Sequence, residues 1–331
     1  MLRKTLLITL LIALMSASAC APQATATTDA LATDIVVTEA PPTEVPTEAP
    51  TTAPTGLTLT DGLGREVKLD APAQRIISLA PSNTEILFAI GADSQVIGRD
   101  NLSDYPEAAS AATDIGSAFE ALNTELIVSL KPDLVLAAEI NTADQVKALE
   151  DLGLTVYYLK NPTTLEELYT NLEIVAQLTG RETEAATLIG DLKARVAAVD
   201  EKIATVTETP TVFYELDATD PAKPYTVGKG TFITLLIERA GGQNIAGDLD
   251  QYPQLSLEQV VAADPDFIIL GDSAYGITPE SVATRPGWSG LSAVINDQVF
   301  PFDDNLLSRP GPRLVDGLEA LAKLLHPELF Q

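Results

Sequence analysis

The feature that most constrains this fold is a pattern that occurs twice: a helix end, a Pro-Asp turn and a buried strand. It spans residues 126–136, around Pro132-Asp133, and returns over residues 259–270, around Pro265-Asp266. Proline ends each helix, and the β-branched run that follows is typical of a strand covered on both faces. Repetition of a whole supersecondary unit predicts two similar lobes.

Strands and helices alternate through the first lobe. Apolar runs predict strands at 75–79, 96–98, 134–137 and 156–159, with a helix over 142–152. The capping-box pattern Ser82-Asn83-Thr84-Glu85 predicts the start of a helix that ends at Gly91. Such alternation favours a parallel sheet with helices on both faces.

The middle of the chain is helical in pattern. Thr164-Leu165-Glu166-Glu167 is a second capping box, Gly180 interrupts the pattern, and a long helix is expected from Glu182 to about Ala204. At about 1.5 Å per residue such a helix can reach roughly 30 Å, which suits a stiff spine between two lobes. In the second lobe we expect strands at 211–215 and 299–302, the latter at an edge, and helices at 231–240 and 313–325.

These patterns divide the chain into five segments. They are a signal peptide at 1–19, a Pro/Thr-rich spacer at 20–56, an N-terminal α/β lobe at 57–163, a helical segment with the spine at 164–206, and a C-terminal α/β lobe at 207–331. The predicted fold class is therefore α/β. The expected architecture is two similar Rossmann-like lobes with parallel sheets, joined by a single long helix.

The N-terminus has the features of an export signal. Arg3 and Lys4 precede an apolar run at 6–15, which is too short to span a bilayer. Ala17-Ser18-Ala19-Cys20 follows and resembles a bacterial lipobox, in which the thiol receives a diacylglycerol. The alternative is an ordinary secretory signal with a spare cysteine. We expect the mature chain to begin at Cys20, outside the cytoplasm and anchored to the membrane by lipid.

Composition restricts the partners. The spacer contains no aromatic residue, so it cannot bury enough surface to fold, and its prolines favour an extended chain. A formal net charge of -27 disfavours binding to nucleic acid. Cys20 is the only cysteine, so no internal disulfide can form and a hydrophobic core must hold the fold.

Four short motifs follow one another in order along the chain. They are Arg75-Ile76-Ile77-Ser78-Leu79-Ala80-Pro81-Ser82-Asn83-Thr84-Glu85-Ile86-Leu87, Asp104-Tyr105-Pro106, Leu130-Lys131-Pro132-Asp133-Leu134-Val135 and Arg309-Pro310-Gly311-Pro312-Arg313. Together they resemble the class III periplasmic binding proteins, the substrate-binding proteins of ABC importers for vitamin B12 and ferric siderophores. The resemblance implies a monomeric, near-rigid clamp that holds a large metal chelate in a ligand cleft between its two lobes, with no enzymatic activity and no resident cofactor. The implied protein partners are a permease and its ATPase.

The resemblance also implies which side chains face the ligand. Aromatic rings with polar tips suit a corrin ring or an iron chelate. The candidates by family position are Tyr105, Phe119, Tyr214, Tyr225, Tyr252 and Asn305. The only tryptophan, Trp288, is expected near the cleft rim of the second lobe.

Basic residues that could line the cleft are few. Because ferric catecholates are strongly anionic whereas corrinoids are close to neutral, this scarcity favours a corrinoid, with a ferric siderophore second. The basic candidates are Arg99, Lys223, Lys229, Arg285 and Arg309.

Rival ligands and functions have less support in the residues. Haem would require an axial His or Tyr, and the only histidine, His326, is expected to be a surface residue at a helix end. A free-metal site would need a His and carboxylate cluster, and a hydrolase a nucleophile beside a base, whereas Ser82 is expected to cap a helix. We therefore expect no metal site and no catalytic residue. A haem-binding importer component and a lipid-anchored sensor or adhesin are the alternatives.

Docking on the permease is a further implication of the resemblance, because the family uses one acidic residue on each lobe. The matching positions are Glu258 and Asp144, and Glu139 and Glu150 are nearby substitutes for Asp144. Helix dipoles keep carboxylates ionised at such N-terminal positions.

The lipobox interpretation gives a direct test. We expect Cys20→Ser to leave a folded globular domain but to release it from the membrane, because the membrane affinity lies in the lipid. Detergent partitioning of the two forms measures this. A serine variant that stays in the membrane fraction would show that the interpretation is wrong.

Overall fold

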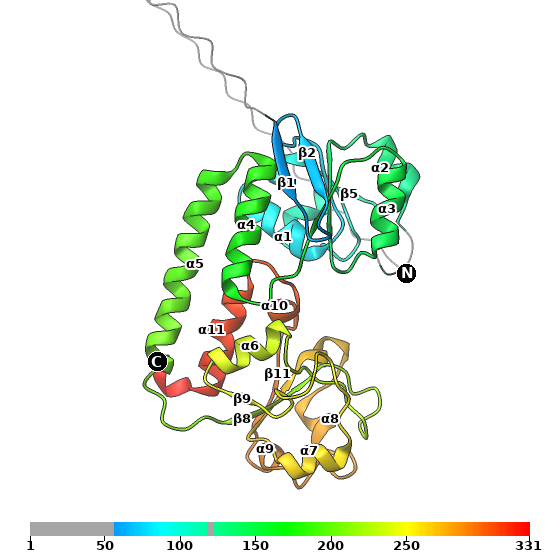
Figure 1. Cartoon of the computed structure of the whole chain (residues 1–331). Coiled ribbons are helices and arrows are strands. Elements are labelled where there is room, and N and C mark those ends of the chain that lie inside the picture. The colour runs from blue at the N-terminus through cyan, green and yellow to red at the C-terminus, as the bar shows by residue number, and fades with distance from the viewer. Residues whose placement is uncertain (1–55, 118, 120–121) are drawn as a thin grey trace, which may run out of the picture. The chain divides into compact units, whose positions relative to one another are not determined.

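The computed structural model describes residues 56–117, 119 and 122–331, so Cys20 and the spacer before residue 56 lie outside the described residues. Two α/β lobes are visible, with long helices running beside them (Figure 1). Within the described ranges, no helix is both long enough and apolar enough to cross a membrane.

The first lobe holds a five-stranded parallel sheet in the order β5-β4-β3-β6-β7. All five residues of β6 are buried, as expected for a strand covered on both faces. An antiparallel hairpin of β1 (Leu57–Thr60) and β2 (Glu66–Leu69), absent from the sequence expectations, precedes this sheet. The other elements are β3 (Ile76–Ser78), α1 (Pro81–Ala89), β4 (Val96–Arg99), β5 (Thr113–Asp114), α2 (Thr124–Ser129), β6 (Leu134–Ala138), α3 (Ala143–Asp151) and β7 (Val156–Leu159).

The second lobe holds a four-stranded parallel sheet in the order β11-β10-β8-β9. The strand that contains Pro301 lies at the sheet edge, as expected, because proline cannot donate to a second neighbour. The elements are β8 (Thr211–Glu215), α6 (Phe232–Arg239), β9 (Gln243–Asn244), α7 (Leu257–Ala263), β10 (Phe267–Leu270), α8 (Pro279–Ala283), α9 (Ser292–Ile295), β11 (Val299–Pro301), α10 (Asn305–Ser308) and α11 (Leu314–Leu325).

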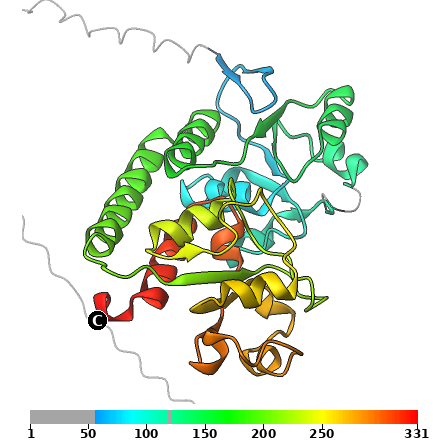
Figure 2. The same ribbon diagram turned by 60° about the horizontal axis from the view of Figure 1, so that its bottom comes forward.

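The spine between the lobes has the bounds that the sequence indicates. Helix α4 (Leu165–Thr179) ends at Gly180, which adopts a left-handed conformation, and α5 (Glu182–Ile203) then runs for 22 residues. Helix α5 lies along one side of the molecule and packs against α11 (Figures 1 and 2). The final helix of the chain therefore braces the spine.

The repeated Pro-Asp turn has the same geometry in both lobes. The residues before the prolines, Lys131 and Asp264, both have positive φ, at 51° and 41°. The Asp133 carboxylate accepts hydrogen bonds from the N–H groups of Gln74 and Arg75, which lead into β3. Asp266 accepts from the N–H of Thr211, the first residue of β8. Each turn thus fixes the start of the central strand of its own sheet.

A buried ion cluster ties the first lobe to the segment that leads into α11. Glu85 of α1 is 3% exposed and accepts two hydrogen bonds from Arg313, at 2.9 Å from Nε and 2.5 Å from Nη2. Arg309 Nη1 lies 3.5 Å from Glu85 Oε1 and 2.5 Å from Asp104 Oδ1. Its hydrogen bond lowers the pKa of Asp104. The Tyr105 ring lies 3.9 Å from the Arg313 guanidinium carbon.

This cluster corrects the expected role of the Ser82–Glu85 motif. Helix α1 begins at Pro81 with Ala80 as N-cap and no side-chain cap, so Ser82 and Glu85 form no capping box. Glu85 is instead the buried partner of two arginines more than 220 residues away in sequence. The acidic residue in the motif stabilises the interlobe geometry rather than the helix start.

Replacing Glu85 with Gln should strongly destabilise the protein. The variant keeps the shape of the side chain but leaves the largely buried Arg313 without a carboxylate and Arg309 with Asp104 alone. We therefore expect a loss of about 3 kcal/mol in the free energy of unfolding. Urea unfolding measures this. The matched control is Asp200→Asn, which removes the carboxylate from the more exposed pair with Arg239 and should cost less than about 1 kcal/mol. Equal losses in the two variants would contradict a structural role for the cluster.

Candidate ligand-binding site

A cleft of about 750 Å³ lies between the lobes. Its volume falls within the range of roughly 300–1,000 Å³ that is typical of small-molecule sites. The first lobe contributes one group of lining residues and the second lobe another. The lining residues are Phe119, Glu139, Ile140, Lys160, Asn161, Pro162, Thr163, Gly230, Thr231, Phe232, Ile233, Gln251, Tyr252, Leu307, Ser308 and Pro310.

The cleft lining is amphipathic and close to neutral. It includes three aromatic residues, Phe119, Phe232 and Tyr252, and two charged ones, Glu139 and Lys160. The first-lobe residues follow the carboxyl ends of β6 and β7, which is the edge where ligands bind to parallel sheets. This surface can hold a large amphipathic molecule without demanding a high charge from it.

The structure brings two of the predicted ligand residues into the cleft. Phe119 is 72% exposed on the first-lobe side, and Tyr252 is 56% exposed on the second-lobe side. Partial burial raises the pKa of Tyr252, and the negative charges of Asp304 and Glu139 raise it further. Glu139 of the first lobe and Tyr252 of the second line the same cleft, so the two walls face each other across it.

Four other predicted residues lie outside this lining. Tyr105 stacks on Arg313, and Arg309 is held by Asp104 and Glu85. The remaining two are Tyr225, whose backbone pairs with residues 217 and 254, and Asn305, whose side chain donates to Asp303 at 2.9 Å.

Tyr214 is a correction, because the structure places it in the core. Its side chain is 0% exposed and its hydroxyl donates to Asp304 at 2.6 Å. Burial, followed by the charge of Asp304, raises its pKa well above the ordinary value. A Cβ at Gly271 would lie only 2.5 Å from the Tyr214 oxygen, so the turn after β10 requires glycine there. The ring supports the cleft floor and offers no surface to a ligand.

Trp288 and Arg285 are also core residues, not cleft residues as expected. Trp288 is 0% exposed, packs on Phe213 and donates from Nε1 to the Pro221 carbonyl at 3.2 Å. Arg285 is buried and donates to both oxygens of Glu215, at 2.5 and 2.8 Å. Of the other expected cleft cations, Arg99 donates to the backbone carbonyls of residues 100 and 109. Lys160, a cation outside the sequence candidates, is the one that lines the cleft.

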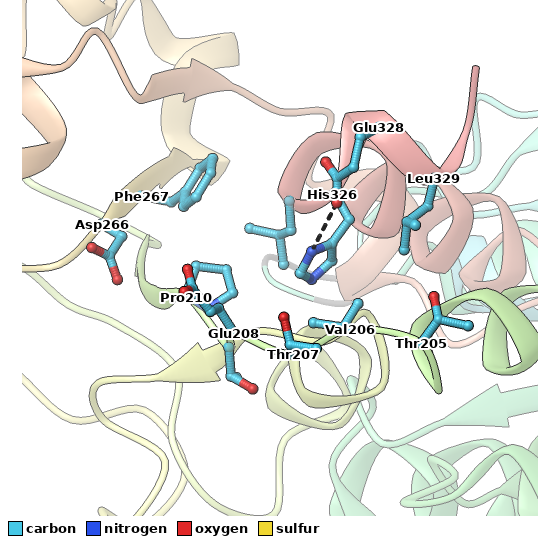
Figure 3. A pocket seen from close by; sticks show the side chains of 12 residues that line it. Thr205, Val206, Thr207, Glu208, Pro210, Asp266, Phe267, His326, Glu328 and Leu329 are labelled. Atoms are coloured by element: carbon cyan, nitrogen blue, oxygen red, sulfur yellow. Dashed lines mark ion pairs between the residues drawn. The ribbon is translucent and has the colours of Figure 1, made fainter.

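A different pocket, of about 490 Å³, surrounds His326 (Figure 3). The histidine ends α11 as expected, but its ring is only 5% exposed, so the expected surface position is wrong. Its Nε2 lies 3.2 Å from the Gly241 carbonyl oxygen, and its Nδ1 lies 3.8 Å from Glu328. This pocket includes Asp266, which precedes β10, so it lies at the amino edge of the sheet and not at the ligand edge.

Sequence reasoning missed the part of the cleft that α6 contributes. Thr231 caps α6 by accepting a hydrogen bond from the Thr234 N–H, and Phe232 follows it into the lining. The signal was present in the turn Gly228-Lys229-Gly230 before the helix. Gly228 allows a close approach, because a Cβ there would lie 2.2 Å from the Leu249 carbonyl oxygen. That contact brings the segment carrying Tyr252 against the start of α6.

One buried carboxylate, at the carboxyl edge of the second-lobe sheet, has an unusual environment. Asp272, in the turn after β10, is 5% exposed, and its Oδ2 accepts a hydrogen bond from the Ala218 N–H at 3.2 Å. Burial and then the charge of Glu215 raise the pKa of Asp272 to about 6. Within the described residues, no group of three or more His, Cys, Asp or Glu side chains could hold a metal ion.

Comparison with known families identifies the class of protein. The model of the periplasmic binding protein family matches residues 76–306, and the chain belongs to this family. Its members bind solutes and are not enzymes. The two lobes with parallel sheets match the class III architecture, as the sequence implied.

Individual relatives agree with this assignment. The chain is 34% identical over 280 residues to the uncharacterized ABC transporter substrate-binding lipoprotein YvrC of Bacillus subtilis, covering 83% of this chain and 87% of the relative. The crystal structure of the vitamin B12 binding protein BtuF of Vibrio cholerae is 30% identical, with a TM-score of 0.67 and coverage of 78% and 99%. The heme-binding protein RhuT of Roseiflexus sp. RS-1 is 28% identical, with a TM-score of 0.69 and the same coverage.

The Asp272 environment predicts a pH-dependent effect on stability. The folded pKa is raised above the unfolded value, so the neutral acid favours folding at low pH and this contribution is lost as pH rises from about 4 through 6. Asp272→Asn should therefore stabilise the protein at pH 8 by about 1 kcal/mol more than at pH 4, allowing for solvent screening. Thermal unfolding of both forms across this range tests it. The exposed Asp248→Asn control should show no such trend, and a pH-independent effect at Asp272 would contradict the assignment.

Proposed function

We propose that this protein is an extracytoplasmic, lipid-anchored substrate-binding protein that captures a corrinoid and delivers it to an ABC permease. The observation that carries the choice of ligand is the amphipathic, nearly neutral lining of the interlobe cleft. Corrinoids are large, amphipathic and close to neutral, so they match that lining. Ferric catecholates are strongly anionic, and among the described lining residues Lys160 is the one cation to receive them. The likeness to a vitamin B12 binding protein supports the same ligand class.

Haem is the second candidate, because Tyr252 could serve as an axial ligand to its iron. Of the lining residues that the structure describes, Tyr252 is the one tyrosine, and none is a histidine. Against haem, its two propionates would meet one lysine and the carboxylate of Glu139. A ferric siderophore of low charge is compatible with the same surface.

Isothermal titration with cyanocobalamin, dicyanocobinamide, haemin and ferric enterobactin tests this choice. We expect a corrinoid to bind with a Kd below about 10 μM, equivalent to roughly -7 kcal/mol. Tyr252→Ala should weaken binding about tenfold, because the ring contributes much of one cleft wall. The matched control is Tyr225→Ala, a tyrosine of the same lobe outside the lining, which should change little. The proposal fails if no corrinoid binds, or if both tyrosine variants behave alike.

A second variant separates the two ligand classes. Tyr252→Phe keeps the ring and should preserve corrinoid affinity within about threefold, but it removes the oxygen that would coordinate haem iron. If haemin binds the parent protein tightly but no longer binds the Tyr252→Phe variant, haem replaces the corrinoid as the proposed ligand.

Docking on the permease is proposed to use equivalent helices of the two lobes. Aligning the repeated Pro-Asp turns pairs α7 with α2, and both helices have a side-chain N-cap, Ser256 in α7 and Asn123 in α2. The exposed acid after each cap is Glu258 in the second lobe and Glu125 in the first. Asp144 is also exposed near a helix start, but it belongs to α3, which follows β6. The repeat therefore favours Glu125 over Asp144 as the counterpart of Glu258.

Charge reversal tests this pairing. Carboxylate pairs at a transient interface mainly set encounter rate and orientation, so we expect Glu258→Arg and Glu125→Arg each to lower uptake about tenfold without changing ligand affinity. Asp144→Arg should have a smaller effect, and Glu201→Arg on the spine should have none. Transport by the reconstituted permease measures the effect on uptake, and a binding titration of each variant measures its ligand affinity. Normal transport by the Glu125→Arg/Glu258→Arg double variant would rule out this docking surface.

A further inference from the structure

A second cavity lies at the carboxyl edge of the second-lobe sheet, and none of its lining residues belongs to the interlobe cleft. It measures about 480 Å³ and is lined by Leu216, Asp217, Thr219, Asp272, Tyr275 and Ile277. Leu216 and Asp217 follow β8, whereas Asp272 and Tyr275 belong to the turn after β10. Because these two parallel strands are neighbours, their carboxyl ends meet here, at the edge where such sheets bind ligands.

One residue of the cavity lining, Asp272, carries a buried acceptor without a partner. Asp272 is 5% exposed, and its Oδ1 has no hydrogen-bond partner among the described residues. The buried cation nearby, Arg285, is already bonded to both oxygens of Glu215. An unsatisfied buried carboxylate oxygen is costly, so a donor supplied by a ligand would relieve that cost.

The other lining residues indicate which kind of donor fits. Among the described residues that line this cavity, the two charged ones, Asp217 and Asp272, are both acidic, and none is a cation. Leu216 and Ile277 supply apolar wall. Tyr275 is 88% exposed, so its ring is available to cover a ligand at the mouth. Carboxylates with an aromatic face and apolar walls favour a cationic nitrogen on a hydrocarbon arm.

We propose that this cavity binds a primary ammonium group carried on a short alkyl chain. Asp272 accepts a hydrogen bond from the ammonium group, and the Tyr275 ring covers its positive charge. The ammonium group can belong to a free amine or to an arm of a chelate held in the neighbouring cleft. This site is additional to the corrinoid site and does not depend on corrinoid binding.

Titrations with matched probes test the site. Butylammonium chloride is compared with butan-1-ol, and ferrioxamine B, which carries an ammonium arm, with N-acetylferrioxamine B, which lacks the charge. Backbone amide NMR shifts report whether the residues of the cavity respond. In at least one pair, we expect the charged probe to change the amide chemical shifts of these residues and the neutral probe to change them much less. A response to butylammonium identifies a free-amine site, and a response to ferrioxamine B alone identifies an arm of a chelate.

Two variants make the assignment specific. Asp272→Asn is close in shape and should weaken binding of the charged probe about tenfold, because it removes a charge-assisted hydrogen bond. Tyr275→Ala alters an exposed side chain, so folding is preserved, and we expect about threefold weaker binding. The control Asp248→Asn removes one negative charge elsewhere in the same lobe and should change nothing. Equal responses to charged and neutral probes, or unchanged binding in the Asp272 variant, would overturn the proposal.

Discussion

The buried Glu85 carboxylate is the interaction on which the arrangement of the two lobes depends. It belongs to the first helix of the first lobe, and its two arginine partners lie in the Arg309–Arg313 segment that leads into α11. Helix α11 in turn packs along the spine helix α5. One ion cluster therefore joins the first lobe to the helix that braces the spine. The ion cluster and the spine helix are thus two separate connections between the lobes, and we expect them to limit relative motion of the lobes more than a single flexible linker would.

We expect the distance between the lobes to be fixed, and a fixed distance would explain the character of the cleft. A rigid clamp does not close around whatever enters, so its walls must already suit the ligand. Phe119 and Tyr252 stand on opposite walls, and the lining between them is close to neutral. Tyr214 and Trp288 act one layer deeper, where they stabilise the second lobe. The position of each aromatic ring relative to the sheet edge thus decides whether the ring faces the ligand cleft or packs in the core.

Much of the fold follows from sequence because local signals agree with one another. Gly180, the Pro-Asp turns and the β-branched runs each predict an element boundary, and the strands and spine occur where they indicate. The β1–β2 hairpin was missed because its strands alternate exposed with more buried residues, so they lack the continuous apolar run that marks the buried strands. The Ser82–Glu85 motif wrongly predicted a capping box for a different reason. The Glu85 carboxylate can cap a helix or pair with an arginine, and the local sequence does not show that Arg313 lies beside it.

The cleft was less predictable than the fold. A tyrosine in a strand, such as Tyr214, gives no local sign of whether its ring points into the core or toward the cleft. Phe232 and Lys160 reach the cleft only because α6 and the loop after β7 meet there. Arg285 could be assigned to the core only once Glu215 was known to lie beside it. Such residues depend on tertiary contacts that no short pattern contains.

The central claim is that the lobes form one rigid clamp. It is tested most directly by the distribution of distances between spin labels on the two lobes, measured by pulsed electron resonance. Because Cys20 is the only cysteine, Ala148→Cys in α3 and Ala262→Cys in α7 can be labelled on a Cys20→Ser background; both alanines are exposed. We expect one narrow distribution that keeps its centre when ligand is added, and a broader one when Glu85→Gln is introduced. A broad distribution in the parent protein, or one that Glu85→Gln leaves unchanged, would contradict the account.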